Sequence, residues 1–402
     1  MIFFIEESKH KIIYNYYILN IKIYMMKKKE KKNLEEKIKI VNYHEANAYI
    51  RDSAYIRRGY LLNCNTIPKV FKSLFMIHNE TINIWSHLIA SIIVIILIIY
   101  TILKINTFEI IKNYLNQINN ISLKITNVYQ FDSIRNSIIS FSNDLQKIIT
   151  YQLKIPDKYN KSLKNLINKL QTFSKKNDFL KNLTLIFLNL KNLFHNKKAL
   201  EKWPIYIFLL SAFLCLIFST IFHMVGNMSQ KIHKYFSRFD YGGISLLISG
   251  STFPPYFYFF YCDKVYQIIY LIFISFFGLC VFLYSFNEKF HLKETKKIRG
   301  TLFLIFGISA GIPILHMAFF GKDIKGFFGM PKLFFWYIGG LCYILGAFLF
   351  MFRFPEKLFP GKFDIIGSSH QIFHILVVFG VLFHYFGSLD AYFYRINNIC
   401  PV

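Results

Sequence analysis

Two histidines near the end of the chain, His370 and His374, have a spacing that suits metal binding. Four residues apart in a helix, their side chains lie on one face and next to each other. Two imidazoles at that spacing can hold a transition metal, usually zinc, when a third ligand comes from elsewhere in the chain. The alternative is a pair of polar residues at a helix start that hydrogen-bond and reach toward water.

The elements that would hold these histidines are membrane-spanning helices. Hydrophobic residues make up 54% of the 402-residue chain, and seven stretches contain no Lys, Arg, Asp or Glu. Each has roughly the 20 apolar residues that a spanning helix needs. We therefore predict an all-α integral membrane protein, a bundle of seven transmembrane helices in the plasma membrane or an internal membrane. The spans are expected at about residues 82–103, 203–226, 241–262, 265–287, 300–321, 333–352 and 365–389.

The net charge of +26 does not point to nucleic acid. The basic residues fall in tails and in loops between spans, where a membrane protein keeps them in any case, so we expect the lipid bilayer as the partner and no nucleic acid. The six cysteines are scattered and form no CxxC pair. They indicate neither a thiolate zinc site nor a disulfide framework.

The chain divides by composition into a tail and a membrane domain. Residues 1–54 are rich in Lys, Glu, Ile and Tyr, which predicts a basic cytoplasmic tail that is solvated and partly helical. Residues 55–402 carry the seven spans. Residues 104–202, rich in Asn, Lys, Ile and Leu, interrupt this domain and are interpreted as a low-complexity insert.

The basic residues of the short loops also predict the orientation of the bundle. The loops after spans two, four and six carry eleven Lys and Arg, and the loops on the other side carry five, with the long insert left out. Because loops rich in Lys and Arg stay inside the cell, the N-terminus is expected in the cytoplasm and the C-terminus outside.

That orientation gathers five polar residues at the cytoplasmic ends of three spans: Ser219, His223, Asp240, His370 and His374. Ionisable groups inside a bilayer are costly and usually mark a site. Three His ligands with a fourth position left to water are typical of a catalytic zinc site, which would lower the pKa of that water toward about 7. Asp240 could orient the water or accept its proton, and Ser219 could hydrogen-bond the water or a substrate carbonyl.

Structural alternatives exist for several of these residues. Asp240 could cap the third span, and Ser219 could bond its own backbone carbonyl. His384 lies ten residues beyond His374, too far to join the cluster, and is interpreted as a packed polar residue. Pro254–Pro255 and Pro313 are expected to kink their spans, which would open room in the bundle.

Four segments resemble the progestin and adipoQ receptor family, and adiponectin receptors more than the shorter haemolysin III members. They are HNETINIWSHL (78–88), STIFH (219–223), FSRFDYGGISLLISGSTFPPYFYFFYC (236–262) and FPEKLFPGKFDIIGSSHQIFHILVVFGVLFHYFG (354–387). The resemblance implies a seven-helix bundle with a cytoplasmic N-terminus. It also implies a zinc ion held at the cytoplasmic end by His223, His370 and His374, with Ser219 and Asp240 nearby.

The same family belongs to a wider group of membrane hydrolases that includes alkaline ceramidases, while other members are described as hormone receptors. The resemblance therefore implies hydrolysis of a lipid amide such as ceramide by zinc-activated water. The first alternative is a signalling receptor whose zinc only ties helices together, and a weaker one is a haemolysin-like pore or transporter. The insert at residues 104–202 departs from the family pattern, and no extracellular ligand can be identified. A lipid-sized cavity beside the histidines would favour the enzyme.

Overall fold

The computed structural model describes residues 20, 22, 24–26, 37–51, 53–125, 200–291, 295–320, 333–397 and 400. The chain divides into two compact units. One consists of Met1–Val94 with Lys202–Val402, and the other is Ile95–Glu201. Most of the predicted insert, residues 126–199, lies outside the described residues.

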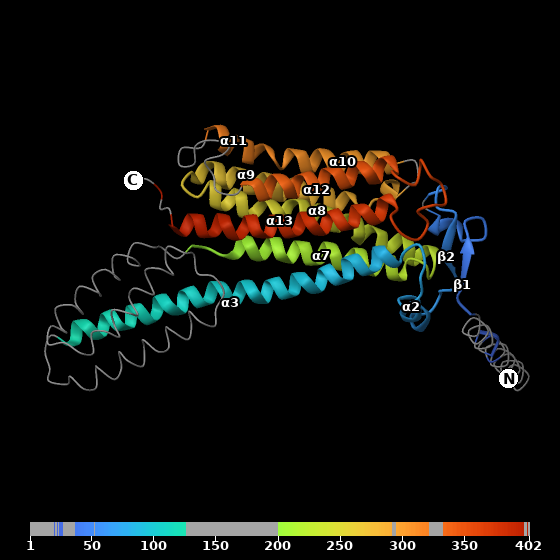
Figure 1. Cartoon of the computed structure of the whole chain (residues 1–402), viewed down its shortest axis with the longest axis horizontal. Coiled ribbons are helices and arrows are strands. Elements are labelled where there is room, and N and C mark those ends of the chain that lie inside the picture. Colours follow the sequence, from blue (N-terminus) through green and yellow to red (C-terminus); the bar gives the residue numbers. More distant parts are fainter. Residues whose placement is uncertain are drawn as a thin grey trace, which may run out of the picture. The chain divides into compact units, whose positions relative to one another are not determined.

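Helices dominate the first unit, and Figure 1 shows α7, α8, α12 and α13 running alongside one another. The helices are α2 (Ile67–Ser73), α3 (Thr81–Ile125, which continues into the second unit), α7 (Trp203–Val225), α8 (Gln230–Phe259), α9 (Lys264–Tyr284), α10 (Lys296–Ser309), α11 (Ile312–Phe320), α12 (Leu333–Phe352) and α13 (Ser369–Asn397). In the described part of the chain, six helical stretches are long and apolar enough to cross a membrane, and α10 with α11 forms one of them. The prediction of an all-α, multi-pass integral membrane protein is confirmed.

The helix α8, which corresponds to the predicted third span, is longer and more polar than that prediction. It begins at Gln230, where the Ser229 hydroxyl accepts a hydrogen bond from the backbone N–H of Ile232 at 3.3 Å. The span was predicted to start at residue 241 because Lys231, Lys234 and Arg238 interrupt the apolar pattern. The structure shows that these residues are already helical.

Small residues let α8 lie very close to α7. A methyl group added at Gly243 would come within 2.9 Å of the Cys215 α-carbon, so the two backbones are nearly in contact there. Close approach through small residues is the usual way in which membrane helices pack, because lipid supplies no hydrophobic force between them. This contact brings the end of α7 beside the first half of α8.

The two proline sites behave differently. The helix α8 continues through Pro254 and Pro255, which are buried. The fifth span is interrupted between Ser309 and Ile312, directly before Pro313, and the carbonyl of Ala310 in the break accepts a hydrogen bond from Tyr256 at 2.6 Å. A proline removes one backbone donor, and the chain separates into α10 and α11 at this point.

The region before the first span is not entirely a solvated tail. The strand β1 (Lys39–Asn42) pairs antiparallel with β2 (Arg58–Leu62), and the 3₁₀ helix η1 (Ala48–Ile50) lies between them. The chain between residues 46 and 60 has a small apolar core of its own, formed by Ala46, Ile50, Ile56 and Tyr60. The backbone N–H of Arg57 also donates to the Asp364 carboxylate at 2.8 Å, which joins this region to the loop before α13.

A disulfide bond contradicts the prediction made from the cysteines. Cys262, after α8, and Cys400, after α13, form a disulfide across 138 residues. The Arg395 side chain lies beside it and donates from Nε to the Tyr258 carbonyl at 3.0 Å. The expectation of no disulfide was wrong, because nothing in the local sequence reveals that the two helix ends meet.

Candidate metal centre

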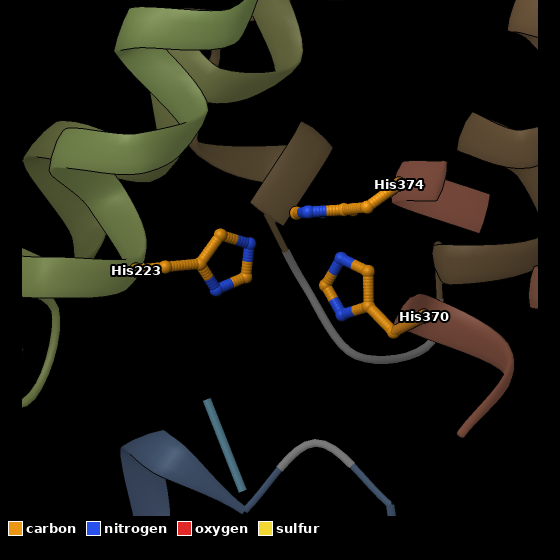
Figure 2. A group of neighbouring side chains, drawn as sticks. All are labelled: His223, His370 and His374. Carbon is orange, nitrogen blue, oxygen red and sulfur yellow. The ribbon is translucent and has the colours of Figure 1, made fainter. Parts of the chain in front are cut away.

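Three imidazole rings converge at one end of the bundle. Figure 2 shows His223 on α7 facing His370 and His374 on α13. One ring nitrogen from each residue can be chosen so that the three all lie within 4.8 Å of one another. The centroid of the His223 ring lies 5.0 Å from that of His370 and 4.9 Å from that of His374. The structure therefore brings together the three residues predicted as metal ligands.

The start of α13 is fixed by hydrogen bonds that aim its two histidines at α7. The backbone N–H of Ser369 donates to the buried Glu356 carboxylate at 2.8 Å. The Gln371 side-chain oxygen accepts from the backbone N–H of Gly367 at 2.7 Å. The first turn of a helix leaves backbone donors without partners inside the helix, and here side chains satisfy donors at this start. His370 and His374 thus project from an anchored first turn and the turn after it.

A second layer of polar groups orients the rings. His223 donates from Nδ1 to the Glu80 carboxylate at 2.8 Å, and His374 donates from Nδ1 to the Asn83 carbonyl at 3.2 Å. The Asn83 side chain in turn donates to Glu80 at 2.7 Å. With Nδ1 engaged in this way, the Nε2 atoms of both rings are the ones suited to a metal.

Electrostatics keep Glu80 ionised in this arrangement. Burial raises the pKa of the Glu80 carboxyl, but the hydrogen bond from His223 and the charge of that ring outweigh burial and lower the pKa to about 2. A carboxylate that accepts the outer N–H of a ligating histidine is a common partner in zinc sites. The donor set of three imidazoles with carboxylate and carbonyl support therefore fits zinc.

Sequence reasoning missed three residues of this centre: Glu80, Asn83 and His87. The His87 ring stacks on the His374 ring, with centroids 3.8 Å apart and planes inclined by 8°. Asn83 and His87 are four residues apart on one face of α3, and Glu80 directly precedes that helix. That spacing, inside the segment HNETINIWSHL, was the available signal.

Asp240 and Ser219 line the same cavity as the three histidines. The Ser219 hydroxyl lies close enough to the Asp240 carboxyl to interact with it, and Ser219 itself is buried. The alternative that Asp240 caps its helix is wrong, because Ser229 is the cap and Asp240 lies ten residues inside α8. Asp240 therefore faces the cavity from inside α8 and does not cap its helix.

The cavity is large and mostly apolar. Its volume is about 600 Å³, within the range of pockets that bind small molecules. Its lining starts at the three histidines, follows α8, α10 and α12, and includes Trp336 and His384. His384 is buried, as predicted for a packed polar residue, and does not belong to the histidine group at the candidate metal centre.

Comparisons with known proteins agree with this architecture. Residues 179–385, which include all three histidines, Ser219 and Asp240, match the model of a family described as haemolysin-III related. The chain is 33% identical to heptahelical transmembrane protein 5 of Arabidopsis thaliana, over 89% of this chain and 92% of that protein. It is 28% identical to the ADIPOR-like receptor IZH2 of Saccharomyces cerevisiae, over 88% and 84%. It is also 40% identical to the adiponectin receptor protein of Drosophila melanogaster, over 47% of this chain and 42% of that protein.

Proposed function

Because the chain belongs to the haemolysin-III related family of multi-pass membrane proteins, we propose that it is a zinc-dependent hydrolase of a lipid amide such as ceramide. The observation that carries this proposal is the convergence of His223, His370 and His374 beside Asp240 at one end of a lipid-sized cavity. A bundle tightly filled around the histidines would have favoured a zinc ion that only ties helices together.

Each polar residue has a role in this proposal. His223, His370 and His374 would hold the zinc ion, while Glu80 and the Asn83 carbonyl keep two of the rings oriented. Zinc with three imidazole ligands and an open position acidifies a bound water and polarises a carbonyl. Asp240 would take up the proton of the attacking water and return it to the leaving amine. Ser219, beside Asp240, would keep that carboxyl in place.

The cavity suits a lipid because most of its lining away from the histidines is apolar. Phe303, Ile344 and Val377 are examples from three different helices. A long hydrocarbon chain would lie along these side chains with its amide next to the histidines, since burial of apolar surface stabilises that placement.

The proposed orientation has the histidines at the cytoplasmic side, and two observations support it. In the sequence, the segments between the predicted spans carry eleven Lys and Arg on the histidine side and five on the other side. The Cys262–Cys400 disulfide lies beyond the last turn of α13, whereas the histidines lie in its first two turns. Because disulfides persist in the secretory lumen and outside the cell, the end of α13 belongs on that side.

In sealed cells we therefore expect a C-terminal tag to be accessible to antibody or protease, and an N-terminal tag to be accessible only after permeabilisation. The matched control is the same pair of tags on permeabilised cells, where both should be reached. An N-terminal tag that is reached in sealed cells would place the histidines at the outer leaflet and contradict the orientation.

Metal removal tests the function itself. Purified protein in detergent–lipid micelles should release fatty acid from a long-chain ceramide, lose that activity with a zinc chelator, and regain it when zinc is added back. Magnesium added back is the control, since its preference for oxygen ligands does not suit three imidazoles. Stoichiometric zinc without turnover of any lipid amide would instead support a signalling receptor with a structural zinc ion.

A further inference from the structure

The cavity has a second group of polar side chains, far from the three histidines. His384 of α13 and Trp336 and Tyr343 of α12 all line it. The ring centroids of Trp336 and His384 are 4.6 Å apart, and those of Tyr343 and His384 are 5.2 Å apart. Trp336 is 4% exposed and His384 is 8% exposed, so both are buried among the helices, while Tyr343 is partly buried.

The hydrogen-bonding capacity of this group is largely unused. Among the described residues, the Trp336 indole nitrogen, the Tyr343 hydroxyl and His384 Nδ1 are buried and have no hydrogen-bond partner. Only the other His384 nitrogen is engaged, because Nε2 donates to the Trp336 carbonyl at 3.3 Å. Leaving a buried polar group without a partner is costly, so three such groups on neighbouring side chains need an explanation.

The fold makes room for these three side chains. Each packs over a glycine of the opposing helix: His384 over Gly339, Tyr343 over Gly380, and Trp336 over Gly387. A methyl group at any of these glycines would collide with the ring that covers it. If this end of the cavity had only to be filled, phenylalanine and leucine would be enough. The Trp, Tyr and His side chains found there instead provide polar atoms at defined positions.

The pattern of donors and acceptors identifies the group that would fit. The indole N–H and the phenol O–H can donate, and His384 Nδ1 is left as an acceptor because Nε2 carries the proton donated to Trp336. A hydroxyl group both accepts and donates, so it can pair with either kind of group, whereas a carboxylate only accepts. A charged group at this depth would also be costly, since it lies well inside the membrane span.

The distance along α13 between His374 and His384 indicates which part of a lipid would carry that hydroxyl. His374 and His384 are ten residues apart in one helix, which corresponds to about 15 Å. That is about half of the roughly 30 Å hydrocarbon core of a bilayer. A lipid with its head at the histidines would therefore reach His384 with the far half of its chain.

We propose that Trp336, Tyr343 and His384 form a subsite that recognises a hydroxyl group in the far half of a long hydrocarbon chain. The ligand class is a hydroxylated long-chain acyl lipid. The inference rests on the proposed function in one respect, that the polar head of the lipid lies at the three histidines. Hydrogen bonds that only an oxygenated chain can form would make the subsite a determinant of specificity.

The test is direct binding to the purified full-length protein, measured by displacement of a fluorescent fatty acid without any turnover. The probes are octadecanoic acid, the same acid hydroxylated in its far half, the ketone at that same carbon, and the acid hydroxylated next to the carboxyl group. The far-hydroxylated acid should bind about 5- to 30-fold tighter than the plain acid, as expected for two net hydrogen bonds. The ketone, which cannot donate to His384, should fall between them, and the near-hydroxylated acid should show no gain.

Variants show which residues cause a preference for the far-hydroxylated acid. Tyr343→Phe removes one hydroxyl and keeps the ring, and it should reduce the preference for the far-hydroxylated acid about three- to tenfold. His384→Phe should abolish most of the preference. Tyr337→Phe is the matched control, because it removes a buried hydroxyl on the same helix that does not line the cavity. If the wild-type protein binds the plain and far-hydroxylated acids equally, or if Tyr343→Phe leaves the preference intact, the subsite is excluded.

The outcome is independent of whether the protein is a hydrolase. A preference for the far hydroxyl without any amide hydrolysis would support the subsite and contradict the proposed reaction. Hydrolysis of a lipid amide without a preference for the far hydroxyl would support the proposed reaction and contradict the subsite.

Discussion

Replacing His370 or His374 with Ala is expected to reduce the zinc content of the purified protein from about one ion per chain to nearly none. Two of the three proposed ligands sit on α13, and either loss leaves two imidazoles, fewer than stable zinc sites in proteins use. Metal analysis of protein purified without added zinc measures the result directly. The side chains face a cavity, so the substitution should leave the helices folded.

Two further variants sharpen this test. His316→Ala removes a histidine that bonds Tyr270 on α9 and lies outside the cluster, so zinc content should not change. Glu80→Gln keeps all three ligands but weakens the orientation of His223, and should lower zinc affinity about 10- to 100-fold. Full zinc content in both the His370 and the His374 variants would refute the proposed ligand set.

Replacing Asp240 with Asn should lower the rate of lipid amide hydrolysis by about 10²- to 10⁴-fold while zinc content stays unchanged. The amide has the size of the carboxyl but cannot take up a proton, and general acid–base groups contribute on that scale. The rate and the zinc content should be measured on the same preparation. His223→Ala in parallel should lose both together.

A suitable control is Asp263→Asn, which alters an aspartate at the start of α9. The Asp263 side chain caps that helix, and Asn caps nearly as well, so both rate and stability should be close to wild type. Hydrolysis that persists in the Asp240→Asn protein would show that another group accepts the proton.

The spans could be predicted from the sequence because a bilayer imposes a simple rule on them. A run of about 20 residues without charge is visible in any window, and α7 and α12 begin and end within a residue of the predicted bounds. The rule fails where a helix continues beyond the membrane. Lys234 and Arg238 are helical residues of α8, and their charge concealed the true start of that helix.

Part of the candidate site could be predicted from the sequence for a related reason. His223, His370 and His374 stand out because ionisable residues in apolar helices are rare. Glu80 and His87 did not stand out, because they precede or begin the first span, where polar residues are ordinary. Their meaning depends on the contact of α3 with His223 and His374, which is tertiary.

The cavity and the disulfide were beyond sequence reasoning. The cavity is the space that remains when α8, α10, α12 and α13 pack. Its size and lining depend on how distant helices meet, which no local sequence pattern predicts. Cys262 and Cys400 are 138 residues apart, and their pairing follows from two helices ending at the same place.

The helix α13 is fastened at both ends, by Glu356 and Gln371 at its start and by Arg395 and the Cys262–Cys400 bond near its finish. These contacts resist rotation and sliding of the helix. The separation of His374 from His384 is then set by the rise of the helix, about 1.5 Å per residue, and stays constant while other helices shift. In the proposed complex, the distance between the polar head of a lipid and its hydroxyl group would therefore be set by ten residues of helix backbone, about 15 Å.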